Sequence, residues 1–148
     1  MKTIYLVACV AQKAEKPRQA EDLYLSDWFR KARSYVRGRM SLQDSWYILS
    51  AKYYLLEPSR VISPYNETLN TMSKPERLRW AACVLSQLLP ITDASDSIIM
   101  LAGTRYREAL EPALRARGCT VEVPMAGLGI GEQKAWLLGH TACREVQL

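Results

Sequence analysis

The sequence predicts an α/β protein in which a central four-stranded, mainly parallel sheet lies between two layers of helices, a three-layer α/β/α arrangement. Short apolar segments alternate along the chain with longer segments whose apolar residues recur every three or four positions, the pattern of strands that alternate with helices. The 148 residues, 49% of them hydrophobic, have the size of one ordinary domain. We therefore expect residues 1–148 to form a single domain.

The first strand and the first helix occupy the N-terminal third of the chain. Residues 3–10 form a continuous apolar run, which is typical of a strand buried on both faces. Residues 12–24 are polar and contain a proline, so they predict a loop. From Leu25 onward apolar side chains recur at helical spacing up to Gly38, a residue suited to end a helix.

A second strand and a second helix follow. Residues 45–51 predict the strand, and residues 58–72, which carry two prolines and no clean period, predict a long loop. Ser73 and Glu76 have the spacing of a capping box, with Pro75 in the first helical turn. We therefore expect a helix to begin directly after Ser73.

Two further strands and helices complete the pattern. Residues 96–103 and 119–125 predict the third and fourth strands. The helix between them should bend or restart near Pro112, because proline lacks the backbone donor that a helix needs, and Gly118 should end it. Residues 126–140 begin as a glycine-rich loop and enter the last helix.

The charge of the chain is uneven, and this asymmetry suggests a partner. The net charge of +5 lies entirely in residues 1–40, which hold nine Lys and Arg against four Asp and Glu. A basic third of this kind is typical of a surface that binds a polyanion such as DNA. It is equally the pattern of a solvated helix face.

The cysteines and the histidine argue against a metal centre. Cys9, Cys83, Cys119 and Cys143 stand far apart, and His140 is the single histidine, so we expect no metal site and no cofactor. No segment approaches the roughly 20 apolar residues of a membrane-spanning helix, and the first residues do not resemble a secretory signal. These features predict a cytoplasmic protein with reduced thiols and no membrane contact, and we expect it to be a monomer.

The candidate site lies at the carboxyl ends of the predicted strands, where open α/β sheets bind their ligands. Those ends lead into four loops, residues 8–24, 50–68, 102–106 and 124–132. In and beside these loops the candidate site residues are Cys9, Gln12, Lys13, Asp22, Tyr24, Ser26, Ser50, Lys52, Tyr53, Tyr65, Asn66, Thr68, Gly103, Tyr106 and Gly129.

Several residues of the first two loops allow two interpretations. Lys13 and Lys52 could each hold a phosphate or simply be solvated. Asp22 could act as a general base, although acids near helix N-termini also serve as caps. Cys9 would need a thiolate-stabilising partner to act as a nucleophile, and is otherwise a thiol at a strand end.

The segment after the second strand is the most unusual. Tyr53 and Tyr65 could stack on a planar base while Asn66 reads its edge. Tyrosines after a strand also cover cores, and Asn66 also forms turns. The glycines around Gly129 lack the spacing of the dinucleotide fingerprint, yet they could let backbone amides approach a phosphate.

Across nearly the whole chain the sequence resembles a small, largely uncharacterised domain family of bacteria and phages, in the blocks ACVAQK, DLYLSDWFRKARSYV, WYILSAKYYLLEP, ISPYNETL, MLAGTRYREAL and GLGIGEQKAWL. That family opens with a strand that ends in Cys with a nearby Lys, and it continues with LY-x-S, LSA-K-Y-G-L-L and Y-x-x-T-L segments. Tyr54 departs from the pattern, because the family usually has glycine at that position.

More distantly, parallel strands with ligands at their carboxyl ends are similar to the uracil-DNA glycosylase superfamily, which includes phage-defence enzymes that remove modified bases. That superfamily carries Gly, Gln, Asp and Pro after its first strand and a His-Pro-Ser motif after its fourth. Here ACVAQK and PMAGLG stand in those places. The resemblance therefore implies a uracil-DNA-glycosylase-like fold and the location of the site, but it transfers no catalytic residue.

The function that this resemblance implies is a hydrolase: a DNA glycosylase that cleaves the N-glycosidic bond of a modified or damaged base, such as a glucosylated hydroxymethylcytosine of phage DNA. It would leave an abasic site, in base excision or antiviral defence. Asp22 would supply negative charge or orient a water, Asn66 would read the base, and Lys13 would hold a phosphate or assist the leaving base. Two alternatives stay open: a hydrolase of free nucleosides or nucleotides, and a non-catalytic module that binds a modified base.

Overall fold

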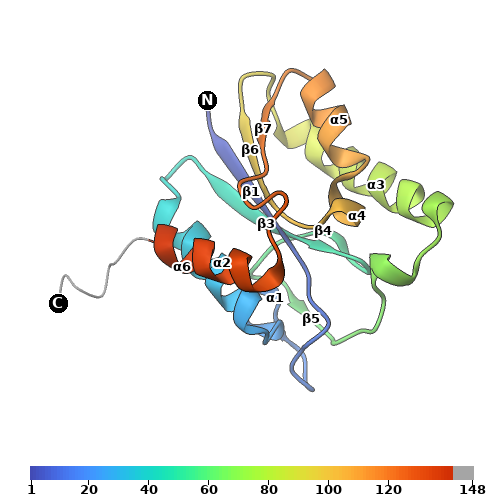
Figure 1. The fold of residues 1–148 in the computed structure, drawn as a ribbon. Coiled ribbons are helices and arrows are strands. Elements are labelled where there is room, and N and C mark those ends of the chain that lie inside the picture. Colours follow the sequence, from blue (N-terminus) through green and yellow to red (C-terminus); the bar gives the residue numbers. More distant parts are fainter. Residues whose placement is uncertain (142–148) are drawn as a thin grey trace.

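The computed structural model describes residues 1–141 and has a five-stranded sheet at its centre (Figure 1). In spatial order the strands are β4 (Tyr54–Leu56), β3 (Ser45–Ser50), β1 (Thr3–Ala8), β6 (Ser97–Leu101) and β7 (Thr120–Glu122). The strands β3, β1, β6 and β7 run parallel, and β4 runs antiparallel to β3. The four predicted parallel strands are therefore confirmed.

The fifth strand corrects the prediction of four. A tight turn follows β3, because the Ser50 hydroxyl accepts hydrogen bonds from the backbone N–H groups of Lys52 and Tyr53, at 3.3 and 2.9 Å. Tyr54 then adopts a left-handed backbone with φ of 63°, and the chain returns along β3. A three-residue strand is too short to produce a pattern in the sequence.

The order of the strands places β1 at the point where the chain changes direction across the sheet. β1 pairs with β3 on one side and with β6 on the other, with Ile4 beside Ser45 and Ile98. In open α/β sheets such a reversal leaves a crevice outside the carboxyl ends of the strands. Cys9, directly after β1, therefore lies where a ligand site is expected.

Helices cover both faces of the sheet (Figure 1). α2 and α6 pack together on one face, and α3, α4 and α5 form the other layer. The Trp28 indole N–H of α2 donates to Gln133 Oε1 of α6 at 2.8 Å and links these two helices. The bounds of the helices are α1 (Ala20–Leu23), α2 (Asp27–Arg39), α3 (Lys74–Leu88), α4 (Thr104–Arg107), α5 (Leu110–Ala116) and α6 (Ile130–His140), with 3-10 turns η1 (Leu69–Thr71) and η2 (Leu89–Ile91).

The predicted signals of the later helices are confirmed, whereas α2 does not end at Gly38 but continues to Arg39, with Met40 as its C-cap. Ser73 and Glu76 form the capping box that starts α3, with Pro75 in its first turn. The helix after β6 breaks into α4 and α5, so that Pro112 falls within the first turn of α5, where its missing N–H costs no hydrogen bond. Gly118 follows α5 with φ of 104°, a left-handed conformation that favours glycine.

A second, two-stranded sheet joins two of the site loops. β2 (Arg18–Gln19) pairs antiparallel with β5 (Val61–Ile62), and the Ala20 N–H donates to the Arg60 carbonyl at 2.8 Å. The loop after β1 and the loop after β3 are thereby held side by side.

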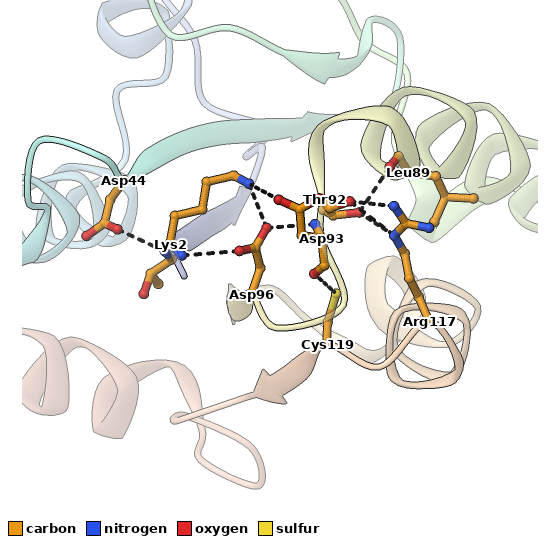
Figure 2. A network of polar contacts seen from close by, with 9 residues as sticks. Lys2, Asp44, Leu89, Thr92, Asp93, Asp96, Arg117 and Cys119 are labelled. Atoms are coloured by element: carbon orange, nitrogen blue, oxygen red, sulfur yellow. Dashed lines mark hydrogen bonds and ion pairs between the residues drawn. The ribbon is translucent and has the colours of Figure 1, made fainter.

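Polar contacts link the segments at the amino ends of the parallel strands (Figure 2). This amino edge of the sheet lies opposite the site loops. Asp96 is almost fully buried and accepts hydrogen bonds from the backbone N–H and the ammonium of Lys2, at 3.1 and 2.7 Å. It also accepts from the Asp93 N–H, and Asp44 accepts from the Thr3 N–H, each at 2.8 Å. These bonds fasten the start of β1 to the turn before β6.

Among residues 1–141, Cys9, Cys83 and Cys119 are free thiols, and no group of three or more metal-binding side chains is present. Cys143 lies outside the described residues. No helix in the described part is long and apolar enough to cross a lipid bilayer.

Candidate functional site

A pocket of about 400 Å³ opens at the carboxyl edge of the sheet. Three of the four predicted loops line it: the loop after β1, the loop that leads to η1, and the start of α4. The lining residues are Cys9, Val10, Ala11, Lys13, Tyr65, Asn66, Glu67, Thr68, Asn70 and Tyr106. The structure thus brings together six of the predicted site residues, separated by up to 97 positions in the chain.

One wall of this pocket rests on a buried chain of hydroxyl groups. The Tyr65 hydroxyl lies 2.6 Å from that of Tyr24 and accepts from the Ser50 hydroxyl at 2.8 Å. Ser50 is fully buried, and its carbonyl accepts from the Trp80 indole at 2.8 Å. Burial raises the pKa of both phenols, so they stay neutral and fix the ring of Tyr65 in place.

A second wall is formed by Tyr106, which projects from α4. Its hydroxyl lies 3.3 Å from Cys9 Sγ, and its ring packs edge to face against Trp80, with 5.5 Å between centroids. Burial raises the pKa of the Tyr106 phenol. A neutral phenol and the thiol that follows β1 therefore border the pocket, and both can form hydrogen bonds.

Lys13 brings the positive charge of the pocket. Its Nζ lies 4.3 Å from the centre of the Tyr65 ring and 5.8 Å from that of Tyr24, and it donates to the Ala11 carbonyl at 3.3 Å. Burial lowers the pKa of the Lys13 ammonium, although the electrostatic influence of Cys9 and Glu67 opposes this effect. The lysine is held against an aromatic wall.

The rim of the pocket carries polar side chains from the segment that precedes and forms η1. Asn66, Glu67 and Asn70 line the pocket and are exposed, while Thr68 caps η1 by accepting from the Asn70 N–H at 3.2 Å. Sequence reasoning missed Glu67 and Asn70. Their position between Asn66 and the capping box of α3 was the available signal, because the same loop already held predicted site residues.

A second pocket, of about 460 Å³, adjoins the first and shares Cys9, Val10, Asn70 and Tyr106 with it. It extends past Gly103 to Ile130 and Gln133 at the start of α6. The fourth predicted loop therefore reaches the site region. Gly129 lines a further hollow beyond Gly103, and its N–H donates to Glu132 at 3.1 Å, which starts α6.

Asp22 lies apart from the pocket at the carboxyl edge. It is exposed and forms an ion pair with Arg33 at 3.2 Å. Both residues line a separate pocket of about 530 Å³ together with Arg18 and Arg30. The short helix α1 turns Asp22 toward α2, so the structure does not bring it together with Asn66 or Lys13.

Four other predicted residues have local roles. Ser26 caps α2 by accepting from the Phe29 N–H at 3.0 Å, and the Gln12 carbonyl accepts from the Leu25 N–H at 2.9 Å. Tyr53 packs edge to face on Tyr65 with 5.6 Å between ring centroids, and the exposed Lys52 lies 5.5 Å from the Tyr53 ring. Tyr53 thus packs against the wall residue Tyr65, whereas Ser26, Gln12 and Lys52 do not line the pocket.

The chain matches the model of a family of unknown function, DUF6884, over residues 4–139. It belongs to this family. The predicted membership of a small, uncharacterised family is therefore confirmed, and every residue that lines the pocket at the carboxyl edge lies inside the DUF6884 match.

A bacterial relative supports the same assignment. The chain is 30% identical over 123 residues to the uncharacterized protein YfjM of Bacillus subtilis (strain 168), an alignment that covers 77% of this chain and 78% of that protein. No solved structure matches the chain significantly.

Proposed function

We propose that this DUF6884 protein is a DNA glycosylase that hydrolyses the N-glycosidic bond of a modified or damaged base. The observation that carries the proposal is the convergence of an aromatic wall, amide groups, a carboxylate and a lysine around one pocket of about 400 Å³ at the carboxyl edge of the sheet. A likeness to the uracil-DNA glycosylase superfamily is part of the proposal, and it rests on the parallel strands and the position of the site.

The lining of this pocket, here called the base pocket, suits a planar base. The buried Tyr65 ring lies beneath Lys13 and supplies an aromatic wall, and the side chains of Asn66 and Asn70 at the rim each offer a donor and an acceptor to a base edge. A base in duplex DNA would have to leave the stack to enter, at a cost of a few kcal/mol. A mismatched or damaged base pairs less firmly and lowers that cost.

The rim of the pocket suits the sugar. Cleavage of the glycosidic bond builds positive charge on the deoxyribose, so a carboxylate near it stabilises the transition state and can orient the attacking water. Glu67 is the carboxylate among the lining residues. We therefore assign to Glu67 the role that the sequence suggested for Asp22, which is paired with Arg33 in another pocket.

The separate pocket that Arg18, Arg30 and Arg33 line, here called the arginine pocket, favours DNA over a free nucleoside as the substrate. Tyr24 forms a wall of this pocket, and its hydroxyl contacts Tyr65 of the base pocket. Arg18 and Arg30 line it and are exposed, and neither has an ion-pair partner within residues 1–141. Two unpaired guanidinium groups next to the base pocket are suited to hold backbone phosphates.

An abasic-site assay tests the proposal. The purified chain, without added metal, is incubated with unmodified, uracil-containing and glucosylated-hydroxymethylcytosine DNA, followed by alkaline cleavage and detection of the released base. We expect alkali-labile sites in one modified substrate. Tight, salt-sensitive binding without base release would instead identify a recognition module, and base release from free nucleosides alone would identify a nucleoside hydrolase.

A charge-reversal experiment tests the role of the arginine pocket. Arg30→Glu should weaken DNA binding and reduce the slope of log affinity against log salt by about one, because one phosphate contact is lost. Arg79→Glu on α3 is the control, since Arg79 lines none of the described pockets. Equal effects of both substitutions would contradict a specific phosphate contact at Arg30.

A further inference from the structure

We propose that Lys13 gives this site a second activity: its Nζ forms an imine with the C1′ aldehyde of an abasic site, and the strand is then cleaved by β-elimination. The inference rests on the proposed function, in which the same pocket produces abasic DNA. It extends that function from base release to strand cleavage.

The backbone around Lys13 is held on both sides. Lys13 forms an isolated antiparallel bridge with Tyr24, the Ala14 N–H donates to the Leu23 carbonyl at 2.8 Å, and the Leu25 N–H donates to the Gln12 carbonyl at 2.9 Å. The half-buried side chain runs over the aromatic wall and reaches the base pocket. A nucleophile must be positioned in this way to meet one atom of a bound sugar.

The surroundings of Lys13 differ from those of a structural lysine. Its Nζ donates to the backbone carbonyl of Ala11, and it forms no ion pair with a carboxylate of residues 1–141. Lys2, in contrast, is bound to Asp96 at 2.7 Å. An amine without a salt bridge loses its proton at a smaller energetic cost.

Burial likewise favours the neutral form of the Lys13 amine. It lowers the pKa of this ammonium from the ordinary 10.5, although the electrostatic influence of Cys9 and Glu67 opposes the lowering. The cation–π contact with the Tyr65 ring likewise opposes the effect of burial, because it favours the charged form. A larger neutral fraction makes the amine a better nucleophile, the usual route to imine-forming lysines.

The chemistry balances without any oxidant or reductant. Nζ bonds to C1′ of the open-chain aldehyde, the aldehyde oxygen leaves as water, and one proton is taken from solution, which yields a protonated imine. A proton then leaves C2′, a double bond forms between C2′ and C3′, and the bond from C3′ to its phosphate oxygen breaks with the electron pair on the phosphate. Glu67 lines the pocket and is placed to accept the C2′ proton. Water hydrolyses the imine and releases Lys13.

Borohydride trapping on DNA with a pre-formed abasic site tests the inference without knowledge of the target base. The full chain is mixed with end-labelled oligonucleotide and sodium borohydride, which reduces an imine to a stable covalent bond. We expect a protein–DNA complex on a denaturing gel, and strand cleavage when borohydride is omitted. Lys13→Arg keeps the positive charge but should lower the trapped yield at least about tenfold.

Lys16→Arg is the matched control, because Lys16 is exposed in the same loop and lines none of the described pockets. Mass spectrometry of the trapped wild-type complex identifies the modified lysine even if Lys13→Arg fails to fold. No trapped complex, undiminished trapping in Lys13→Arg, or a modification at another lysine would overturn the inference. Base release without trapping would leave the proposed glycosylase intact, whereas trapping without base release from any substrate would remove the glycosylase and keep the lyase.

Discussion

The amino and carboxyl edges of the central sheet differ in whether their polar side chains are hydrogen-bonded to the protein. At the amino edge, Asp96 is 1% exposed and accepts three hydrogen bonds, two from Lys2 and one from Asp93 (Figure 2). At the carboxyl edge, the side chains of Asn66 and Glu67 line a pocket and form no hydrogen bond within residues 1–141. Groups that satisfy one another stabilise the fold, whereas groups left facing a pocket are available to a ligand.

Loss of the carboxylate at the pocket should produce the largest effect. Glu67→Gln should reduce base release by about 100-fold or more, because the transition state loses its nearby negative charge and its water-orienting group. The free energy of unfolding should change by less than about 0.5 kcal/mol, since Glu67 is exposed. Single-turnover base release and denaturant unfolding measure the two quantities.

Asp22→Asn is the matched control for Glu67. The Asp22 carboxylate is paired with Arg33 outside the base pocket, so this substitution should leave base release within about threefold of wild type. If Asp22→Asn abolished turnover and Glu67→Gln did not, the assignment of these two carboxylates would be reversed.

At the amino edge the expected effect is on stability. Asp96→Asn should lower the free energy of unfolding at pH 7 by about 2 kcal/mol, because it removes the charge that Lys2 and two backbone N–H groups bind. Base release should not change in the folded variant. A stability within about 0.5 kcal/mol of wild type in urea titrations would contradict a structural role of Asp96.

The same residue predicts a pH window. Burial opposes ionisation of Asp96, yet the hydrogen bonds from Lys2 and Asp93 lower its pKa from 3.8 to about 2. A lowered pKa means that the unfolded chain binds the proton more readily, so this stabilisation is present above about pH 4 and is lost as the pH falls toward 2. Unfolding at pH 7 and at pH 3 should therefore differ more in wild type than in Asp96→Asn.

Removal of one hydroxyl in the site wall should have a smaller effect. Tyr65→Phe deletes the group between the Tyr24 and Ser50 hydroxyls, and both would lose a partner in a buried place. We expect a loss of about 1 to 2 kcal/mol in the free energy of unfolding. Tyr53→Phe is the control, because the Tyr53 hydroxyl has no hydrogen bond within residues 1–141; equal losses in both variants would disprove the buried chain.

The smallest expected effect is a gain. Tyr54 holds φ of 63°, a conformation that costs a non-glycine residue about 1 kcal/mol. Tyr54→Gly should relieve this strain and raise the free energy of unfolding by up to about 1 kcal/mol. The substitution leaves the base pocket unaltered, because Tyr54 does not line it. Lower stability in thermal unfolding would show that the Tyr54 side chain contributes more by packing than its backbone costs.

Local patterns in the sequence determined most of the framework. The apolar runs around Leu6 and Ile98 predicted strands of the parallel sheet, and Ser73 and Glu76 predicted the start of α3, because burial on both faces and helix capping depend on neighbouring residues. The same patterns predicted a ligand site at the carboxyl ends of the strands, where the structure has a pocket.

Only the tertiary structure decided the strand order, the presence of β4 and the choice between carboxylates. Asp22 and Glu67 are both acids in predicted site loops, and nothing near either in the chain separates them. Arg33, eleven residues from Asp22, takes that carboxylate into another pocket, while Glu67 stays at the rim beside Lys13. A side chain's neighbours from distant segments depend on how the helices and loops pack, and that information is spread over the whole chain.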